Sequence, residues 1–468
     1  MKKIILILFS ILILNASEEI GNNPLTLQKA LELLNTNNLE IKAASIDVDS
    51  AKAKADSVSG SNWGKLNLIQ DFANSNDAGN VFGFKVTSRE ATFGDFGFSE
   101  FLTPLGGAIY NASQDIAPQD MSGLLDVKPD ALNYPDSRNL FQTKLKYELP
   151  LFTGFQISSY TDIMNSMTKM KSLEKDQVIN EKKYELRKSF YDMSLLSNSM
   201  NNLETILENI SKLEEMTNNM IEVGYAKETD LLEVQAKKGN VERLLSQMEY
   251  NKKLLYHYIS FLLNEKITSI EIPSTDVQTP SFSNEDILAN NLDIKRANTG
   301  LEVRRSMTDV SKSAYYPMVG AFAEVSTADD TLLGDANDHM AYTVGARLSW
   351  NIFNGGIDSA KVEEAKLEQL KTQSQVLLAR QGIKLKIAKI RTEIETYNSE
   401  VNSLKKELKL SDEIYKNYEG RYKEKLSSMS DVIIKQSEQI QKVLQLQQAL
   451  NKRNERIFAL EKLANGDK

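Results

Sequence analysis

The feature that most constrains this chain is an internal duplication. Residues 37–42 (NNLEIK) return 253 positions later as residues 290–295 (NNLDIK). Residues 151–154 (LFTG) return as residues 352–355 (IFNG), with an offset of 201. Because self-similarity at a fixed offset marks a repeated structural unit, we infer two copies of one unit. The difference between the offsets places an extra block of roughly 50 residues in the first copy.

The ends of the copies predict the domain organisation. Two lysines, an apolar run over residues 4–14 and small residues up to Ala16 are typical of a secretory signal peptide, here residues 1–16. The first structural repeat then covers residues 17–262 and the second covers residues 284–468. Residues 263–283 form an equatorial linker between the repeats.

Alternation of apolar and polar residues predicts two strands in each copy, at about residues 63–72, 140–150, 317–326 and 341–351. Their length, about 10 residues, is what a tilted membrane strand requires. One face should contact lipid and the other a water-filled lumen. The predicted lipid-facing residues are Tyr147, Leu149, Leu348 and Trp350, and the predicted lumenal residues are Lys146, Glu148, Arg347 and Ser349.

Helical periodicity fills most of the remaining sequence. Residues 155–222 contain neither proline nor glycine, which allows one helix of about 100 Å. Apolar residues recur in steps of three and four, which is typical of a coiled-coil seam. The seam residues of the second copy are Ile383, Ile387, Ile390, Ile394, Tyr397, Val401, Leu404 and Leu408.

The composition argues against catalysis. The chain has no cysteine and two histidines, and its acidic residues outnumber its basic ones by 64 to 56. This excludes thiol chemistry and disulfides, and the acidic balance disfavours nucleic acid as a partner. No constellation of nucleophile, metal ligands or cofactor motif is present. We therefore predict a protein that is not an enzyme and has no cofactor.

Four strands cannot close a barrel, because small barrels need about eight strands to leave no open edge. Three copies would supply about 12 strands, enough for a water-filled bore. With the signal peptide, the duplicated helix-strand-strand-helix-helix unit, and the turns at residues 150–154 and 351–356, the chain resembles the outer-membrane efflux protein (TolC) family.

The resemblance implies an α+β membrane protein. Its expected form is a homotrimeric 12-stranded β-barrel, with four strands per chain, continued by a long α-helical coiled-coil barrel. It implies a place in the outer membrane, in contact with its lipid, and extension into the periplasm. It also implies a periplasmic adaptor (membrane fusion) protein and an inner-membrane transporter as partners. The predicted function is an exit duct for an efflux pump or a type I secretion system. An exported trimeric coiled-coil adhesin or structural stalk is the alternative, but it explains the heptads without the strand pairs.

The resemblance also suggests site residues where the paired helices turn. Tyr422 matches a family tyrosine, and Asp230 matches the aspartate to which that tyrosine bonds. Asp431 matches an acidic residue that, repeated in the trimer, forms a ring around the pore. Glu424 is a further acidic candidate. Ser427 and Ile434 depart from the family pattern, since an arginine and a second acid are expected there. The turn tips, which would contact the adaptor, hold Gly224, Tyr225, Leu426 and Ser427. The strand-to-helix turns hold Pro150, Phe152, Gly154, Phe353 and Gly355.

Two readings of Asp230 and Asp431 remain open, because each also stands where it can cap the following helix. The extra block of the first copy, about residues 74–139, is predicted to be a long loop at the extracellular end. It is rich in phenylalanine and glycine, similar to a segment found in one group of the family. Loops of this length are uncommon unless they have a function, although this one could also fold over the barrel mouth without specific contacts.

Overall fold

A computed structural model describes residues 24–114, 122–274 and 277–465. The predicted signal peptide lies outside these residues. The chain divides into two compact units, one made of residues 1–51, 166–302 and 370–468 and the other of residues 52–165 and 303–369.

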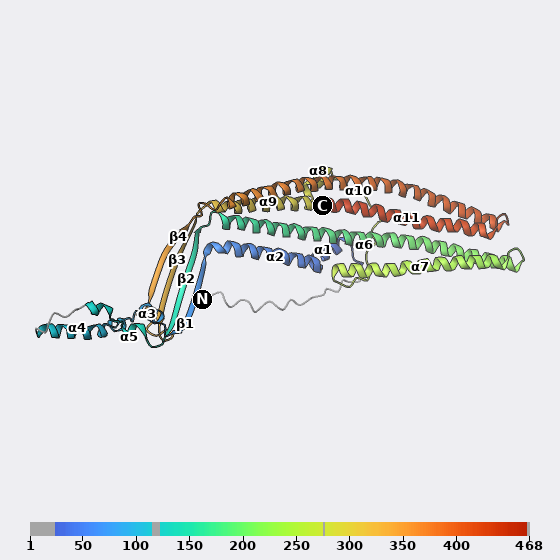
Figure 1. Cartoon of the computed structure of the whole chain (residues 1–468). Helices are drawn as coiled ribbons and strands as arrows, with labels where there is room; N and C mark the ends of the chain where they lie inside the picture. Colours follow the sequence, from blue (N-terminus) through green and yellow to red (C-terminus); the bar gives the residue numbers. More distant parts are fainter. Residues whose placement is uncertain (1–23, 115–121, 275–276, 466–468) are drawn as a thin grey trace. The chain divides into compact units, whose positions relative to one another are not determined.

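The second unit contains one antiparallel sheet of four strands in the order β1-β2-β3-β4 (Figure 1). The strands are β1 (Lys65–Ser75), β2 (Arg138–Phe152), β3 (Met318–Asp329) and β4 (Ala341–Ser349). All four predicted strands are confirmed, with their ends moved by a few residues. For example, β1 begins at Lys65 because residues 61–63 form a short 3-10 turn, after which Gly64 takes a left-handed φ of 70°.

The two repeats meet in the middle of this sheet. β2, from the first copy, pairs with β3, from the second, with Lys146 opposite Glu324 and Leu145 opposite Val325. β1 and β4 are therefore the two edge strands, and within the described residues neither has a partner on its outer side.

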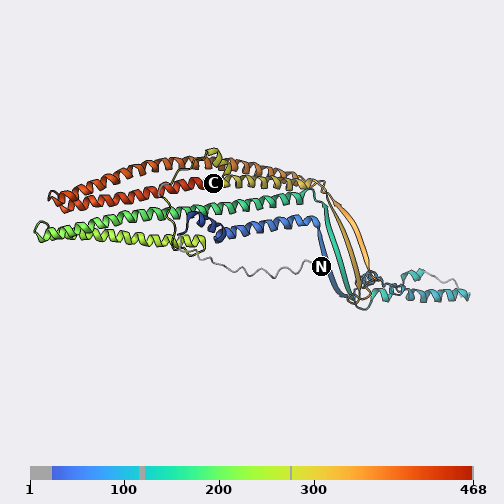
Figure 2. The ribbon, with the colours of Figure 1, turned by 180° about the vertical axis from the view of Figure 1, so that it is seen from behind.

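The helices of the chain follow the predicted order within each repeat. Those of the first repeat are α1 (Leu27–Asn37), α2 (Leu39–Gly60), α6 (Gln156–Glu222) and α7 (Glu228–Leu263). Those of the second repeat are α8 (Asn284–Asn290), α9 (Leu292–Lys312), α10 (Ile357–Lys423) and α11 (Met429–Ala464). Both α6 and α10 contain 67 residues, so each is about 100 Å long. Figure 2 shows the same elements from behind.

The predicted coiled-coil seams form the core of the first unit. One cluster takes side chains from α6, α7, α10 and α11, so both repeats share it. A second cluster buries the isoleucine row of α10 from Ile383 to Ile394 against Ile457 and Leu460 of α11. The three-four spacing in the sequence therefore marks the buried faces, as predicted.

The NNLEIK and NNLDIK repeats form a matched pair of buried joints. The Asn38 side chain donates to the Leu262 carbonyl at 2.8 Å and accepts from the Ile41 N–H at 3.0 Å. Asn291 does the same with the Leu463 carbonyl at 3.2 Å and the Ile294 N–H at 3.1 Å. Both asparagines are almost fully buried. Each joint ties the start of one helix to the end of the last helix of the same repeat.

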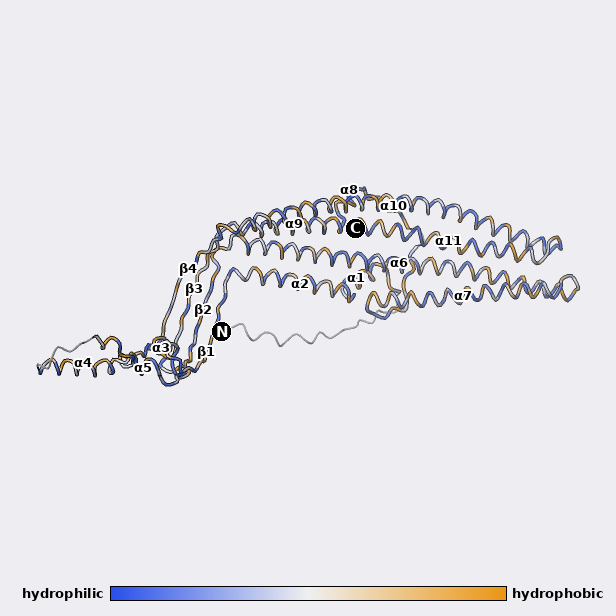
Figure 3. The backbone as a smooth tube through the Cα atoms, viewed as in Figure 1, coloured by the Kyte–Doolittle hydropathy of each residue, from blue (hydrophilic) through white to orange (hydrophobic). Residues whose placement is uncertain are grey.

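Polar and apolar residues alternate along every long helix (Figure 3). Among the residues that the structure describes, none of the helices combines the length and the apolar character that a membrane crossing requires.

The segment between β1 and β2 differs from the long loop that we predicted. It contains α3 (Ala78–Thr87), α4 (Phe98–Ser113) and α5 (Asp130–Asn133). Side-chain caps stabilise these helices: the Asp77 carboxylate accepts from the Asn80 N–H at 3.1 Å, and the Glu100 carboxylate accepts from the Asp130 N–H at 2.7 Å. The prediction was wrong because the glycines and phenylalanines here lie inside or beside helices.

Candidate functional site

The two faces of the sheet differ in chemistry, as the alternation predicted. In the observed register, Tyr147 and Leu149 of β2 share a face with Leu348 of β4. Lys146, Glu148 and Arg347 lie on the opposite face. Trp350 follows the end of β4, and its indole N–H donates to the Tyr315 carbonyl at 3.2 Å. The sheet therefore has one apolar face and one charged face, which is the arrangement of a wall between lipid and water.

The strand-to-helix turn of the first copy is tightly packed. β2 contains Pro150 and ends at Phe152, with an irregular register between them. Gly154 follows in the left-handed region, with a φ of 61°, and α6 begins at Gln156. A Cβ atom on Gly154 would lie 2.6 Å from the Ser313 carbonyl oxygen, so only glycine fits.

The matching turn of the second copy is open. Phe353 is strongly exposed, and Gly355 has a φ of 69°. Nothing lies within 4 Å of the position that a Cβ atom on Gly355 would take. The two equivalent glycines thus share a backbone conformation but differ in their surroundings.

The turns that join the paired helices also share one geometry. After α6, Gly224 has a φ of 76°, its N–H bonds the Ile221 carbonyl at 2.9 Å, and the Tyr225 N–H bonds the Met220 carbonyl at 2.7 Å. After α10, Lys425 has a φ of 60°. Its N–H bonds the Tyr422 carbonyl at 2.9 Å, and the Leu426 N–H bonds the Arg421 carbonyl at 2.7 Å. Both turns are left-handed helix ends of the Schellman type.

Lys425 is unusual because a lysine occupies the position that holds glycine in the other copy. A side chain in the left-handed region costs about 1–2 kcal/mol. Its ammonium group lies 3.2 Å from the centre of the Tyr225 ring, which is a cation–π contact between the two turns. Nearby, the Ser430 hydroxyl donates to the Glu233 carboxylate at 2.9 Å. We call these two contacts the tip contacts.

Sequence reasoning missed the tip contacts. It selected Gly224, Tyr225, Leu426 and Ser427 but neither Lys425 nor Glu233. The repeat offset of 201 could have identified Lys425, because it aligns this lysine with Gly224. Helix ends of this kind favour glycine at that position. Leu426 is strongly exposed, and the Ser427 hydroxyl donates to the Tyr418 carbonyl at 3.2 Å.

Asp230 and Asp431 both cap helices. The Asp230 carboxylate accepts from the Lys227 N–H at 3.1 Å at the start of α7. The Asp431 carboxylate accepts from the Ser428 hydroxyl at 2.7 Å and from the Ser428 N–H at 3.1 Å at the start of α11. These bonds hold the pKa of Asp431 below its usual value of 3.8, so the carboxyl stays ionised throughout the neutral range.

Tyr422 is buried in the shared core of the four long helices, only 5% exposed. Burial raises the pKa of its hydroxyl, and the charge of Asp230 acts in the same direction. A contact with Thr217 opposes this shift, and within the described chain no hydrogen bond joins the hydroxyl to Asp230. The structure therefore brings Tyr422 near Asp230 without the bond that the family resemblance implies. Glu424 lies two residues further on and is exposed.

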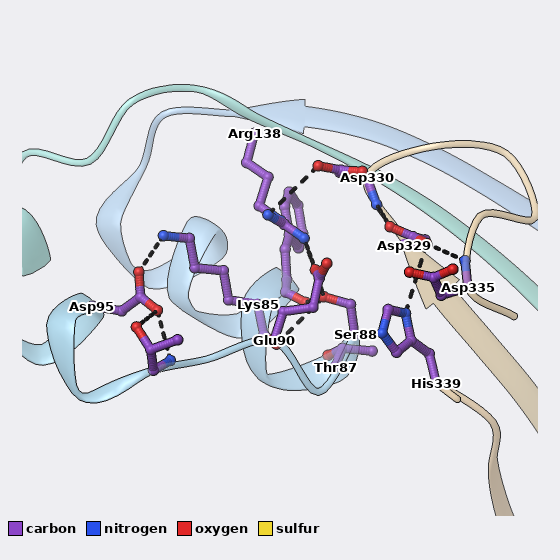
Figure 4. Close-up of polar contacts among 12 residues, drawn as sticks. Lys85, Thr87, Ser88, Glu90, Asp95, Arg138, Asp329, Asp330, Asp335 and His339 are labelled. Carbon is purple, nitrogen blue, oxygen red and sulfur yellow. Dashed lines mark hydrogen bonds and ion pairs between the residues drawn. The ribbon is translucent and has the colours of Figure 1, made fainter. Parts of the chain in front are cut away.

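A network of charges links the segment between β1 and β2 to the β3–β4 turn (Figure 4). Arg138 pairs with Glu90 and lies 3.8 Å from the Asp330 carboxylate. His339 lies 3.7 Å from the Asp329 carboxylate, which accepts the N–H groups of Asp330 and Asp335. No three-residue cluster suited to a metal ion occurs among the described residues. We interpret this network as a structural link between the two segments.

Comparison with known proteins agrees with this geometry. The sequence pattern of the family described as outer membrane efflux protein matches residues 284–466, which is the second repeat. No curated protein sequence matches the chain.

Several solved structures share the fold. CusC is 13% identical, with a TM-score of 0.75 over 94% of this chain and 92% of that chain. VceC from Vibrio cholerae is 14% identical, with a TM-score of 0.72 over 94% of this chain and 96% of that chain. The Campylobacter jejuni CmeC outer membrane channel is 14% identical, with a TM-score of 0.71 over 94% and 85%. The predicted arrangement of the single chain, four strands with long helices, is confirmed.

Proposed function

We propose that the chain, whose second repeat matches the outer membrane efflux protein family, is one subunit of a homotrimeric channel that serves as the exit duct of an efflux pump. The channel spans the outer membrane and extends into the periplasm. A periplasmic adaptor and an inner-membrane transporter are its proposed partners. A type I secretion system is a second system that such a duct can serve.

The observation that carries the proposal is the sheet with one apolar face, one charged face and two open edges. Unpaired edges are not tolerated in lipid, so β1 of one copy must pair with β4 of the next. Large apolar side chains are exposed on both edge strands: Leu68 of β1 is 74% exposed and Val344 of β4 is 72% exposed. Three copies joined in this way close a ring of about 12 strands.

The structural relatives agree with this proposal. CusC undergoes transmembrane channel formation, and CmeC is an outer membrane channel. The alternative, a coiled-coil adhesin or stalk, is not favoured because it leaves the sheet without a role. No part of the proposal requires catalysis.

Edge pairing between copies is testable by crosslinking, because the chain has no native cysteine. We expect the double variant Leu68→Cys, Val344→Cys, treated with a short bis-maleimide, to give a covalent trimer on denaturing gels. Each single variant should stay monomeric there, since it has a cysteine on only one edge. Native mass spectrometry of the extracted protein should show a trimer, and planar bilayers should show discrete channel conductance. A monomeric particle, or crosslinking that stops at dimers, contradicts the proposal.

Asp431, repeated by threefold symmetry, is proposed to form an acidic ring at the periplasmic mouth. Three carboxylates close together repel one another, so a polyvalent cation that binds them relieves the repulsion and blocks the pore. We expect Asp431→Asn to raise the half-blocking concentration of hexamminecobalt(III) about tenfold, while the trimer remains as heat-stable because asparagine also caps helices. Asp230→Asn is the matched control. If the cation block is unchanged in Asp431→Asn, the only role left for Asp431 is to cap α11.

A further inference from the structure

The charged face of the sheet contains a hollow of about 730 Å³ near the end where the strands join the helices. Its lining includes Lys65, Lys146, Glu148, Phe322, Glu324 and Arg347. The residues come from all four strands.

Positive charge is in excess within the hollow, because three basic side chains share its lining with the two carboxylates of Glu148 and Glu324. Lys146 pairs with Glu148 at 2.8 Å. Glu148 attracts Lys65 and Arg347 at longer range, and among the described residues neither of these two side chains forms a close ion pair. Further along the sheet, Lys144 is neutralised by Asp71 at 3.0 Å. The free basic groups are therefore specific to the hollow.

One wall of the hollow is aromatic. Phe322 lies on the charged face, directly between Glu148 of β2 and Gly345 of β4 in the register. Its ring covers Gly345, since a Cβ atom there would come within 2.6 Å of the ring. Arg347 lies opposite Gly320, which has no side chain to obstruct it. The hollow thus combines a guanidinium, an ammonium and an aromatic surface.

We propose that this hollow is a binding site for small aromatic carboxylates on their way through the channel. Arg347 offers a planar fork that binds a carboxylate through two parallel hydrogen bonds, and Lys65 adds a second positive charge. The ring of the ligand packs on Phe322. The inference rests on the proposed function, because the charged face must line the lumen for a solute to reach it.

The test uses the full-length trimer in planar bilayers with three probes of related size. Benzoate has both the carboxylate and the ring, acetate lacks the ring, and benzylammonium reverses the charge. We expect benzoate to reduce the single-channel current at the lowest concentration, acetate to need about tenfold more, and benzylammonium to have no such effect. Equal block by benzoate and benzylammonium overturns the proposal.

Three variants locate the site. Arg347→Gln should raise the half-blocking concentration of benzoate about tenfold, because one charge-assisted contact is lost. Phe322→Leu should remove the preference for benzoate over acetate. Lys144→Gln, on the same face but already paired with Asp71, should change nothing. Heat stability of each trimer shows that it is folded.

The binding site and the channel function are overturned by different outcomes. A wild-type trimer that conducts but binds benzoate no better than acetate overturns the aromatic-carboxylate site and leaves the channel intact. An Arg347→Gln variant with unchanged block does the same. A wild-type protein that gives no conductance in bilayers overturns the proposed function, and the inference with it.

Discussion

Replacing Gly154 by alanine is expected to reduce assembly of the channel strongly. The new Cβ atom would lie 2.6 Å from the Ser313 carbonyl oxygen and 2.9 Å from the Tyr316 Cβ atom, and it would have to adopt a φ of 61°. Backbone strain of this kind together with a displaced backbone costs about 3 kcal/mol or more. The effect acts three times in a trimer, so the amount of trimer extracted from outer membranes should fall at least about tenfold.

The second repeat supplies the matched control. Gly355 has nearly the same φ, 69°, but no atom lies within 4 Å of the position of its Cβ. Gly355→Ala should therefore cost only the backbone term, about 1–2 kcal/mol, and leave trimer levels close to those of the wild type. If both variants assemble equally well, the close packing around Gly154 does not control assembly. If both fail, the left-handed backbone alone is decisive.

We propose that the tip contact between Lys425 and Tyr225 helps to hold the periplasmic end of the channel closed, so its loss is expected to open that end. Tyr225→Leu removes the ring that faces the Lys425 ammonium at 3.2 Å. A cation–π contact of this type is worth about 1 kcal/mol. Three copies together shift the ratio of open to closed channels on the order of a hundredfold. Single-channel recordings should therefore show a higher open probability.

Lys425→Gly tests the same contact from the other side. Glycine suits the left-handed turn, so this variant removes the ammonium while it relieves the strain of a side chain at a φ of 60°. It should open the channel as Tyr225→Leu does and leave the heat stability of the trimer equal or higher. Lys423→Gln removes a charge two residues away, from a lysine that pairs with Glu419 at 3.5 Å, and should leave gating unchanged. Opening in this control, or closed channels in both tip variants, contradicts a role of the Lys425–Tyr225 contact in closing the channel.

The sequence predicted the regular parts of the fold well. Period-two alternation placed all four strands, and the three-four spacing from Ile383 to Leu408 placed the buried seam, because each pattern depends on one continuous contrast between two environments. The duplication also carried structural meaning. Its offsets of 253 and 201 connect Asn38 with Asn291 and Leu262 with Leu463, which are the donors and acceptors of the two joints.

The candidate site was predicted less completely. Asp230 and Asp431 were identified from the sequence. Both cap helices in the structure, which answers the question left open above. Their place in a closed pore stays a prediction. Lys425 was missed because its contact with Tyr225 joins residues 200 positions apart, and no local pattern reports such a pair. The helices α3 and α4 were missed because a segment rich in glycine and phenylalanine favours a loop when only neighbouring residues are considered.

Each asparagine joint connects two helices within the same half of the chain. Asn38 reaches Leu262, and Asn291 reaches Leu463, so neither joint crosses from one half to the other. The halves meet elsewhere: β2 of the first pairs with β3 of the second, and Tyr184 and Tyr191 of the first pack against the cluster that contains Ile457 and Phe458 of the second. The covalent connection between them is therefore not needed to complete either half. We expect two separately synthesised polypeptides, divided between residues 272 and 283, to associate through these contacts and form the complete subunit.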